Sequence, residues 1–83
     1  MNLLIVTPYS QETHVVQWVE AHTPQGSIVI QPEHAPLIIT LVLHKNLTFL
    51  SKTGEVKSIM LNRPGFLEVT RTGVTALLGQ AVT

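Results

Sequence analysis

The chain has 83 residues, of which 45% are hydrophobic and only 12% are charged, and it contains no cysteine. Five basic residues balance five acidic ones, so the chain lacks the basic stripe of nucleic-acid-binding proteins, and we expect no nucleic-acid partner. Without cysteine there are no disulfides and no thiolate metal sites. We predict one small domain over residues 1–83, with an aliphatic surface suited to a partner protein.

Short apolar runs alternate with turn residues along the whole chain. They cover residues 3–6, 15–21, 27–30, 36–43, 47–50, 55–61, 66–70 and 74–82. Short runs at this spacing, rich in Val, Ile and Thr, are typical of a β-sandwich or barrel. We therefore predict an all-β fold, a small β-sandwich of two packed sheets with about 8–10 short strands.

The segment SQETHVVQWVEAH, residues 10–22, fits two structures. Val15, Val16 and Val19 have helical spacing, and Ser10 suits a helix N-cap. The β-branched content instead favours one long strand. The pattern leaves both open. The only tryptophan, Trp18, is of a type that favours the core over a ligand contact.

Two runs near the C-terminus show the two-residue period of half-buried strands. Leu67 and Val69 alternate with Glu68. In the run of residues 74–78, Leu77 makes both sides of the strand apolar. A strand that is apolar on both sides fits the centre of a sandwich or an interface.

The stretch QPEHAPLII, residues 31–39, places Glu33 beside His34. An acid next to an imidazole is the raw material of proton transfer and of metal binding. In extended chain, however, neighbouring side chains point to opposite faces and do not share a substrate. Pro32 and Pro36 fix two φ angles and remove two backbone donors. We predict a rigid corner between two strands.

No other motif points to catalysis. The four histidines, at positions 14, 22, 34 and 44, include no pair at helical zinc-site spacing, and the chain contains no aspartate. The five glycines, at 26, 54, 65, 73 and 79, form no phosphate-binding loop. We expect no catalytic residue, no metal and no cofactor. An enzyme with Glu33 and His34 as acid and base is the least favoured hypothesis.

Three segments together resemble one known family. TPQGSIVIQPEHAPLIITL, residues 23–41, is similar to a family segment with T-x-x-G, a short strand and P-G-H-A-P-L. RPGFLEV, residues 63–69, resembles G-G-F/I-L-E-V, and VTALLGQA, residues 74–81, resembles V-T-V-L-A-x-x-A. The segments resemble, in the same order and with nearly the same spacing, the N-terminal domain of the epsilon subunit of F-type ATP synthase.

This resemblance implies a β-sandwich, and it implies a strand for the ambiguous segment. It also implies a non-catalytic rotor subunit at the foot of the central stalk, which binds the gamma subunit and the c ring. Such a subunit helps to couple ion-driven rotation to ATP synthesis. It would lie on the cytoplasmic side of the bacterial inner membrane, or alternatively at the plastid thylakoid, and reach the membrane only through the complex.

The resemblance also implies interface residues. Candidates for the gamma interface are His34, Ala35, Leu37, Ile38, Arg63 and Phe66. Candidates for a loop that faces the c ring are Gln25, Gly26 and Ser27.

The chain departs from the family pattern at four places. It stops at Thr83, so we expect a short form without the C-terminal helical hairpin, and neither its inhibitory motion nor ATP binding. Glu33 stands where the family often has glycine, which predicts a reshaped turn or a newly presented charge. Ser27 replaces an acidic residue and weakens any salt bridge to the c ring. One extra residue before Gly65 predicts a bulge or a longer turn that displays Arg63.

Two further hypotheses stay open. The chain is a free-standing β-sandwich binding module, or it is an epsilon paralogue outside the housekeeping synthase. A stable monomer that is indifferent to the gamma subunit would favour either of them.

Overall fold

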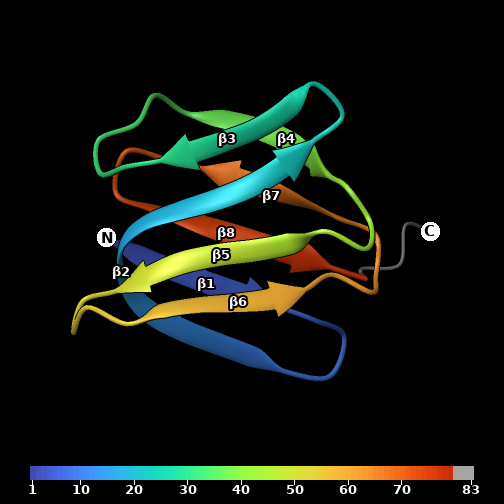
Figure 1. Ribbon diagram of the computed structural model, residues 1–83, viewed down its shortest axis with the longest axis horizontal. Coiled ribbons are helices and arrows are strands. Elements are labelled where there is room, and N and C mark those ends of the chain that lie inside the picture. The colour runs from blue at the N-terminus through green and yellow to red at the C-terminus, as the bar shows by residue number, and fades with distance from the viewer. Residues whose placement is uncertain (80–83) are drawn as a thin grey trace.

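The computed structural model describes residues 1–79 and contains strands and connections over that range. The strands are β1 (Asn2–Val6), β2 (Gln11–Thr23), β3 (Gly26–Ile30), β4 (Leu37–Leu41), β5 (Asn46–Ser51), β6 (Val56–Met60), β7 (Gly65–Val69) and β8 (Gly73–Leu78) (Figure 1). The all-β prediction is confirmed, and each predicted run contains one strand. The last run is a strand to Leu78, and its residues 80–82 lie outside the described residues.

The strands form two layers that are joined through β2 (Figure 1). Sheet I has the order β4-β7-β8-β1-β2, with the first part of β2 at its end. Sheet II contains β3, the second part of β2, β5 and β6. Neighbours are antiparallel except for β1 and β8, which pair in parallel. This arrangement is the predicted β-sandwich.

The 13-residue strand β2 changes sheets at a β-bulge. The register to β5 shifts between Val16 and Trp18, so the alternation of inner and outer side chains slips by one residue. Val16 and Val19 are therefore both buried, at 2% and 0% exposure, although they are three residues apart. The bulge thus produces the helical spacing seen in the sequence, and the helix alternative is wrong.

The same slip turns Trp18 away from the core. Trp18 pairs with Leu50, whose neighbour Phe49 is buried, so Trp18 and Leu50 lie on the outer side of sheet II. Both side chains are half-buried. The prediction that Trp18 lies in the core is wrong.

The core consists of the inner side chains of both sheets, and no buried side chain of the described residues is polar or charged. The largest fully buried side chains are Phe49, Leu3, Ile30, Leu47, Leu67, Val19 and Val69. Fully burying a side chain of this size stabilises the fold by about 1.5–3 kcal/mol. The predicted alternation of Leu67 and Val69 with exposed Glu68 is confirmed.

The corner between β3 and β4 begins with a tight turn over residues 31–34. The His34 backbone N–H donates to the carbonyl oxygen of Gln31 at 3.2 Å, and Glu33 has a φ of 68°. Proline at the second turn position and positive φ at the third are typical of a type II turn. Of the two outcomes expected at Glu33, a reshaped turn is wrong, whereas a presented charge agrees with the structure. Glu33 adopts the left-handed conformation itself, and its side chain is exposed.

The connection between β6 and β7 covers residues 61–64 and leads into Gly65. A Cβ at Gly65 would collide with the carbonyl oxygen of Leu77 on the paired strand β8, which explains glycine at this position. Arg63 is exposed, and its guanidinium carbon lies 5.2 Å from the centroid of the Tyr9 ring.

Over residues 1–79 there is no helix long and apolar enough to span a membrane.

Candidate protein-binding surface

The charged side chains of the chain avoid the outer faces of the sandwich. Those in connections between strands are Glu33, Lys45, Lys52, Glu55, Arg63 and Arg71. Glu12 and Lys57 lie on strands but on their inner sides, opposite Ile5 and Phe49 respectively. Only Glu20 and Glu68 remain for the two outer faces. Each face therefore presents one carboxylate, which is the charge depletion typical of interface cores.

The first surface is the outer side of sheet I, which we call the sheet I face. The register between the strands places on it Ile38, Thr40, Phe66, Glu68, Gly73, Thr75, Leu77, Asn2, Leu4, Val6, Gln11, Thr13 and Val15. Ile38 is 68% exposed, Val15 49% and Phe66 38%. Glu68 is the single charge of this face. Its other side chains are aliphatic groups, one aromatic ring, hydroxyl groups and neutral amides.

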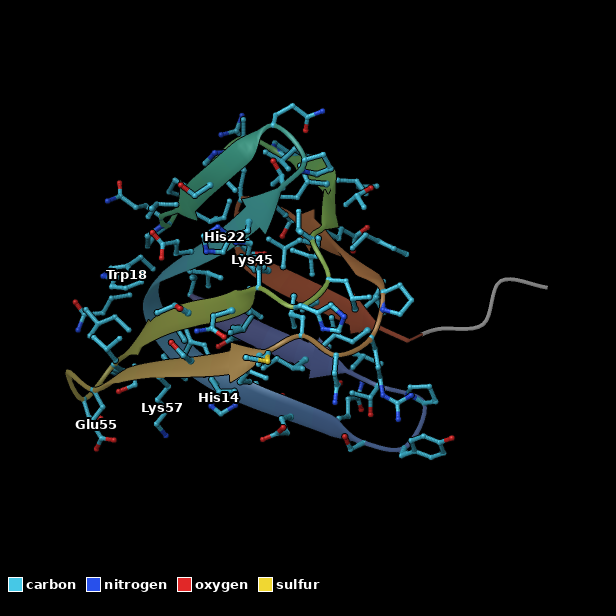
Figure 2. All side chains as sticks on the ribbon, turned by 45° about the vertical axis from the view of Figure 1, so that its right-hand side comes forward. His14, Trp18, His22, Lys45, Glu55 and Lys57 are labelled. Carbon is cyan, nitrogen blue, oxygen red and sulfur yellow. The ribbon has the colours of Figure 1, made fainter. Side chains whose placement is uncertain are left out.

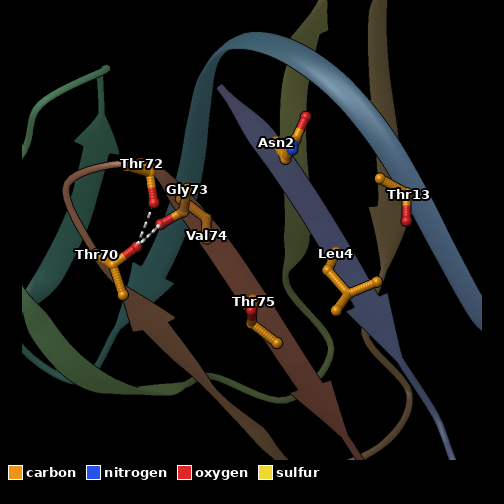
Figure 3. Close-up of a pocket in the computed structure, with 8 residues that line it drawn as sticks. All are labelled: Asn2, Leu4, Thr13, Thr70, Thr72, Gly73, Val74 and Thr75. Carbon is orange, nitrogen blue, oxygen red and sulfur yellow. Dashed lines mark hydrogen bonds between the residues drawn. The ribbon is translucent and has the colours of Figure 1, made fainter.

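Two hollows open on the sheet I face. The first, of about 350 Å³, is lined by Asn2, Leu4, Thr13, Thr70, Thr72, Gly73, Val74 and Thr75 (Figure 3). The Thr70 hydroxyl lies 3.3 Å from the carbonyl oxygen of Gly73, to which it donates, and 3.4 Å from the Thr72 hydroxyl (Figure 3). These groups bond to each other, so the hollow offers hydroxyl and methyl contacts and no charge.

The second hollow, of about 440 Å³, lies beside β4 and is lined by Pro36, Leu37, Ile38, Glu68, Val69 and Thr70. Glu68 lies directly opposite Ile38 in the register of β7 and β4. A carboxylate is therefore set among aliphatic groups, where it can orient a basic side chain of a partner.

The second surface is the outer side of sheet II, which we call the sheet II face. The register places on it Trp18, Glu20, His22, Ser27, Val29, Asn46, Thr48, Leu50, Val56, Ser58 and Met60. Val56 and Met60 are 63% and 64% exposed. Figure 2 shows Trp18 and His22 along β2, and Glu55 and Lys57 near the connection of β5 and β6. Both outer faces thus mix apolar and uncharged polar side chains and carry one carboxylate each.

The structure separates the six predicted gamma-interface residues into groups. Ile38 and Phe66 lie on the sheet I face, on neighbouring strands. Leu37 points inward and packs against the core. His34 and Ala35 lie in the corner before β4, where the His34 Nδ1 is 2.7 Å from the Ala35 carbonyl oxygen.

Arg63 lies away from this corner. The corner is tied to the β7–β8 turn by a hydrogen bond from the Glu33 N–H to the Arg71 carbonyl oxygen, at 3.2 Å. Arg63 precedes β7 at the other end of the sandwich (Figure 1). Of the six residues, then, Ile38 and Phe66 point out on the sheet I face, and Leu37 and Ile38 line its second hollow.

The three predicted c-ring-facing residues, Gln25, Gly26 and Ser27, are exposed at the turn between β2 and β3. The turn is held by the Thr23 hydroxyl, which donates to the Gly26 carbonyl oxygen at 2.8 Å and accepts from the Gln25 N–H at 3.1 Å. Gly26 has a φ of 122°, a conformation that favours glycine. This turn and the β6–β7 loop lie at the same end of the sandwich (Figure 1).

Sequence reasoning missed the part of the sheet I face that is formed by Leu4, Thr13 and Thr75 on β1, β2 and β8. These residues point outward from strands that were recognised in the sequence by the apolar residues of their inner side. The available signal was Leu77, which makes β8 apolar on both sides, because such a strand needs cover on its outer side as well.

The histidines and carboxylates do not gather into a site. Among residues 1–79, no group of three or more His, Cys, Asp or Glu side chains is placed to hold a metal ion. His14 points inward, with its ring centroid 4.9 Å from that of Phe49 and its Nε2 3.7 Å from the Glu12 Oε1.

The chain matches the sequence model of one protein family. The family model described as "ATP synthase, Delta/Epsilon chain, beta-sandwich domain" matches residues 1–83. No curated protein sequence matches the chain significantly.

Among the solved structures that share the fold, two illustrate it. One is a chain in the central stalk and c ring of the mitochondrial ATP synthase of Tetrahymena thermophila, with a TM-score of 0.78 and 20% identity over 96% of this chain. The other is a chain in the OSCP/F1/c-ring assembly of the mitochondrial ATP synthase of Euglena gracilis, with a TM-score of 0.78 and 16% identity over 96% of this chain. The chain spans 63% and 51% of these two relatives.

Proposed function

Because the chain belongs to the family of the ATP synthase delta/epsilon β-sandwich domain, we propose that it is a central-stalk subunit of an F-type ATP synthase. In this role it binds the gamma subunit and the c ring and helps to couple ion-driven rotation to ATP synthesis. It performs no catalysis itself, and it reaches the membrane only through the complex.

The sheet I face carries this proposal. Thirteen outward positions across five strands include a single charge, Glu68. The surface of a monomeric domain normally carries charged side chains throughout. The core of an interface, by contrast, is depleted of charge and gains apolar area. The two hollows on this face offer recesses for side chains of a partner, which is where the residues that dominate binding usually lie.

We assign the sheet I face to the gamma subunit, with Ile38 and Phe66 as its exposed apolar contacts. The turn of residues 24–26 and the neighbouring β6–β7 loop are assigned to the c ring. That turn carries no charged side chain, so its contact with the c ring would depend on shape and on backbone groups rather than on a salt bridge.

The experiment that tests the proposal is co-expression of the chain with the gamma subunit from the same organism. Size-exclusion chromatography is expected to show one complex in which both chains co-elute in equal amounts. Separate elution of a stable monomer would contradict the proposal and support a free-standing binding module. Assembly with the gamma subunit of a second, variant enzyme instead would support a paralogue.

A further inference from the structure

Four strand segments leave one backbone edge without a neighbouring strand among the described residues. In sheet I they are β4 and the first part of β2, and in sheet II they are β3 and β6. The edge of β4 ends at Leu41, because the N–H of the next residue, Val42, donates to the His22 carbonyl oxygen of β2 at 3.0 Å. Such edges present unpaired N–H and C=O groups, to which an extended chain can add. The side chains on these edges decide which of them accept a further strand.

Two of the four edges carry a charge that points between the sheets. Glu12 on β2 lies opposite Ile5, which is 3% exposed, and Lys57 on β6 lies opposite Phe49, which is 1% exposed. An inward-pointing charge on an edge strand opposes pairing, because a further strand would bury that charge. The edges of β3 and β4 hold no charged side chain.

Of these two uncharged edges, only β4 borders the sheet I face. Its outward residues are Ile38, which is 68% exposed, and Thr40. The hollow of about 440 Å³ runs beside it and contains Glu68. Among residues 1–79 no cation forms a salt bridge with this exposed carboxylate, so it is available to pair with a cation of another chain.

The size of the sheet I face points the same way. Five strands about 4.8 Å apart and five residues long cover roughly 24 by 17 Å, or about 400 Å². A standard interface buries about 800 Å² on each partner. A partner that covers the edge of β4 as well as this face buries more area than one that lies on the face alone.

We propose that the partner of the sheet I face adds an extended segment to the free edge of β4 as a further strand. That segment is uncharged except for one Lys or Arg, which pairs with Glu68. The inference rests on the proposed function, since the partner is then the gamma subunit. It adds the strand pairing and the charge that recognises Glu68.

A second copy of this chain does not fit the same edge. Antiparallel pairing of β4 with β4 of a second copy would place only Leu37–Leu41 beside this edge, and that segment contains no basic residue. Glu68 would stay unpaired, and the contact of five residues would be far smaller than a stable dimer needs. The chain alone is therefore expected to be monomeric.

Backbone hydrogen exchange distinguishes strand addition from simple contact. In an antiparallel pair, alternate residues bond to the neighbour and the others point away. In the free chain one alternate set of β4 amides is bonded to β7 and exchanges slowly, while the other set is open. Strand addition slows exchange of the open set, whereas contact with the face alone leaves its N–H groups without partners.

The test is residue-resolved amide exchange in the free chain and in its complex with the gamma subunit. We expect the open set within Leu37–Leu41 to slow at least tenfold in the complex, and the amides of β3 and β6 to be unchanged. A complex that forms without slowing this set would overturn strand addition and leave the proposed function intact. Failure of the complex to form would overturn both.

The charge pairing is tested with Glu68→Gln and Glu68→Lys, with Glu20→Lys on the sheet II face as the matched control. Both positions are on strands, and circular dichroism verifies that the three variants fold. We expect the affinity for the gamma subunit to fall several-fold for Glu68→Gln and more than 30-fold for Glu68→Lys, and to be unchanged for Glu20→Lys. Equal effects of Glu68→Lys and Glu20→Lys would overturn the pairing.

Discussion

The two outer faces of the sandwich have similar compositions but different shapes. Each contains exposed aliphatic side chains and one carboxylate, Glu68 on the sheet I face and Glu20 on the sheet II face. On sheet II the largest side chain, Trp18, is half-buried beside Leu50. On sheet I smaller side chains surround two hollows, one of which borders the uncharged edge strand β4. Composition thus marks both faces as suited to protein contacts, and the hollows and the free edge favour sheet I for the gamma subunit.

The largest expected difference between the faces comes from placing a charge on each. Phe66→Lys on the sheet I face is expected to weaken binding to the gamma subunit about 100-fold, because an unpaired charge buried in an interface costs about 3 kcal/mol. The matched change on the sheet II face is Val56→Lys, at a position that is more exposed, and it should leave the affinity unchanged. Isothermal titration calorimetry measures both. The opposite ranking would reverse the assignment of the faces.

The second prediction concerns the stability that each face contributes. Trp18→Ala is expected to lower the free energy of unfolding by about 2 kcal/mol, since a half-buried ring loses part of the packing of a core aromatic. The affinity for the gamma subunit should not change. Urea denaturation followed by circular dichroism measures the loss, with exposed Val56→Ala as the control. Weakened binding by a folded Trp18→Ala variant would show that sheet II takes part in the contact.

The third prediction concerns the connections, which belong to neither face. Glu33 and His44 are the described non-glycine residues with positive φ, at 68° and 66°. A left-handed conformation costs a residue with a Cβ roughly 1 kcal/mol. Glu33→Gly and His44→Gly are each expected to raise the free energy of unfolding by about 0.5–1 kcal/mol. Denaturant midpoints measure the gain. Unchanged or lower midpoints would contradict the claim that the backbone is strained at Glu33 and His44.

The smallest expected effect is that of salt. Because each face carries one carboxylate and the net charge of the chain is zero, long-range electrostatics contribute little to docking. The affinity for the gamma subunit should change less than about threefold between about 0.05 and 0.3 M salt. A larger decrease with salt would mean that the charged ends of the sandwich, rather than its faces, make the contact.

The sequence predicted the elements better than their geometry. Alternation of Leu67 and Val69 with Glu68 located β7 and its inner side, because the period of two maps directly onto a half-buried strand. The same logic failed in β2, where the bulge between Val16 and Trp18 interrupts the period. A bulge depends on pairing with a distant strand, here β5, and leaves no reliable local signature.

The site was predicted only in part. Ile38 and Phe66 were named, and the structure places them on one face. The part of that face on β1, β2 and β8 was missed because Leu4, Thr13 and Thr75 come together through the register of three strands. Glu33 illustrates the opposite case. Its sequence position identified a turn that favours glycine, but the surrounding hydrogen bonds hold the glutamate in the left-handed conformation.

The most direct measurement of the central claim is the accessibility of the two faces in the assembled complex. Since the chain has no cysteine, Thr13→Cys on the sheet I face and Ser58→Cys on the sheet II face each introduce a single thiol at an exposed position. The rate of maleimide labelling is then compared with and without the gamma subunit. The account predicts that the complex slows labelling at position 13 at least tenfold and leaves position 58 unchanged. Equal labelling of both positions, or protection of position 58 alone, would contradict it.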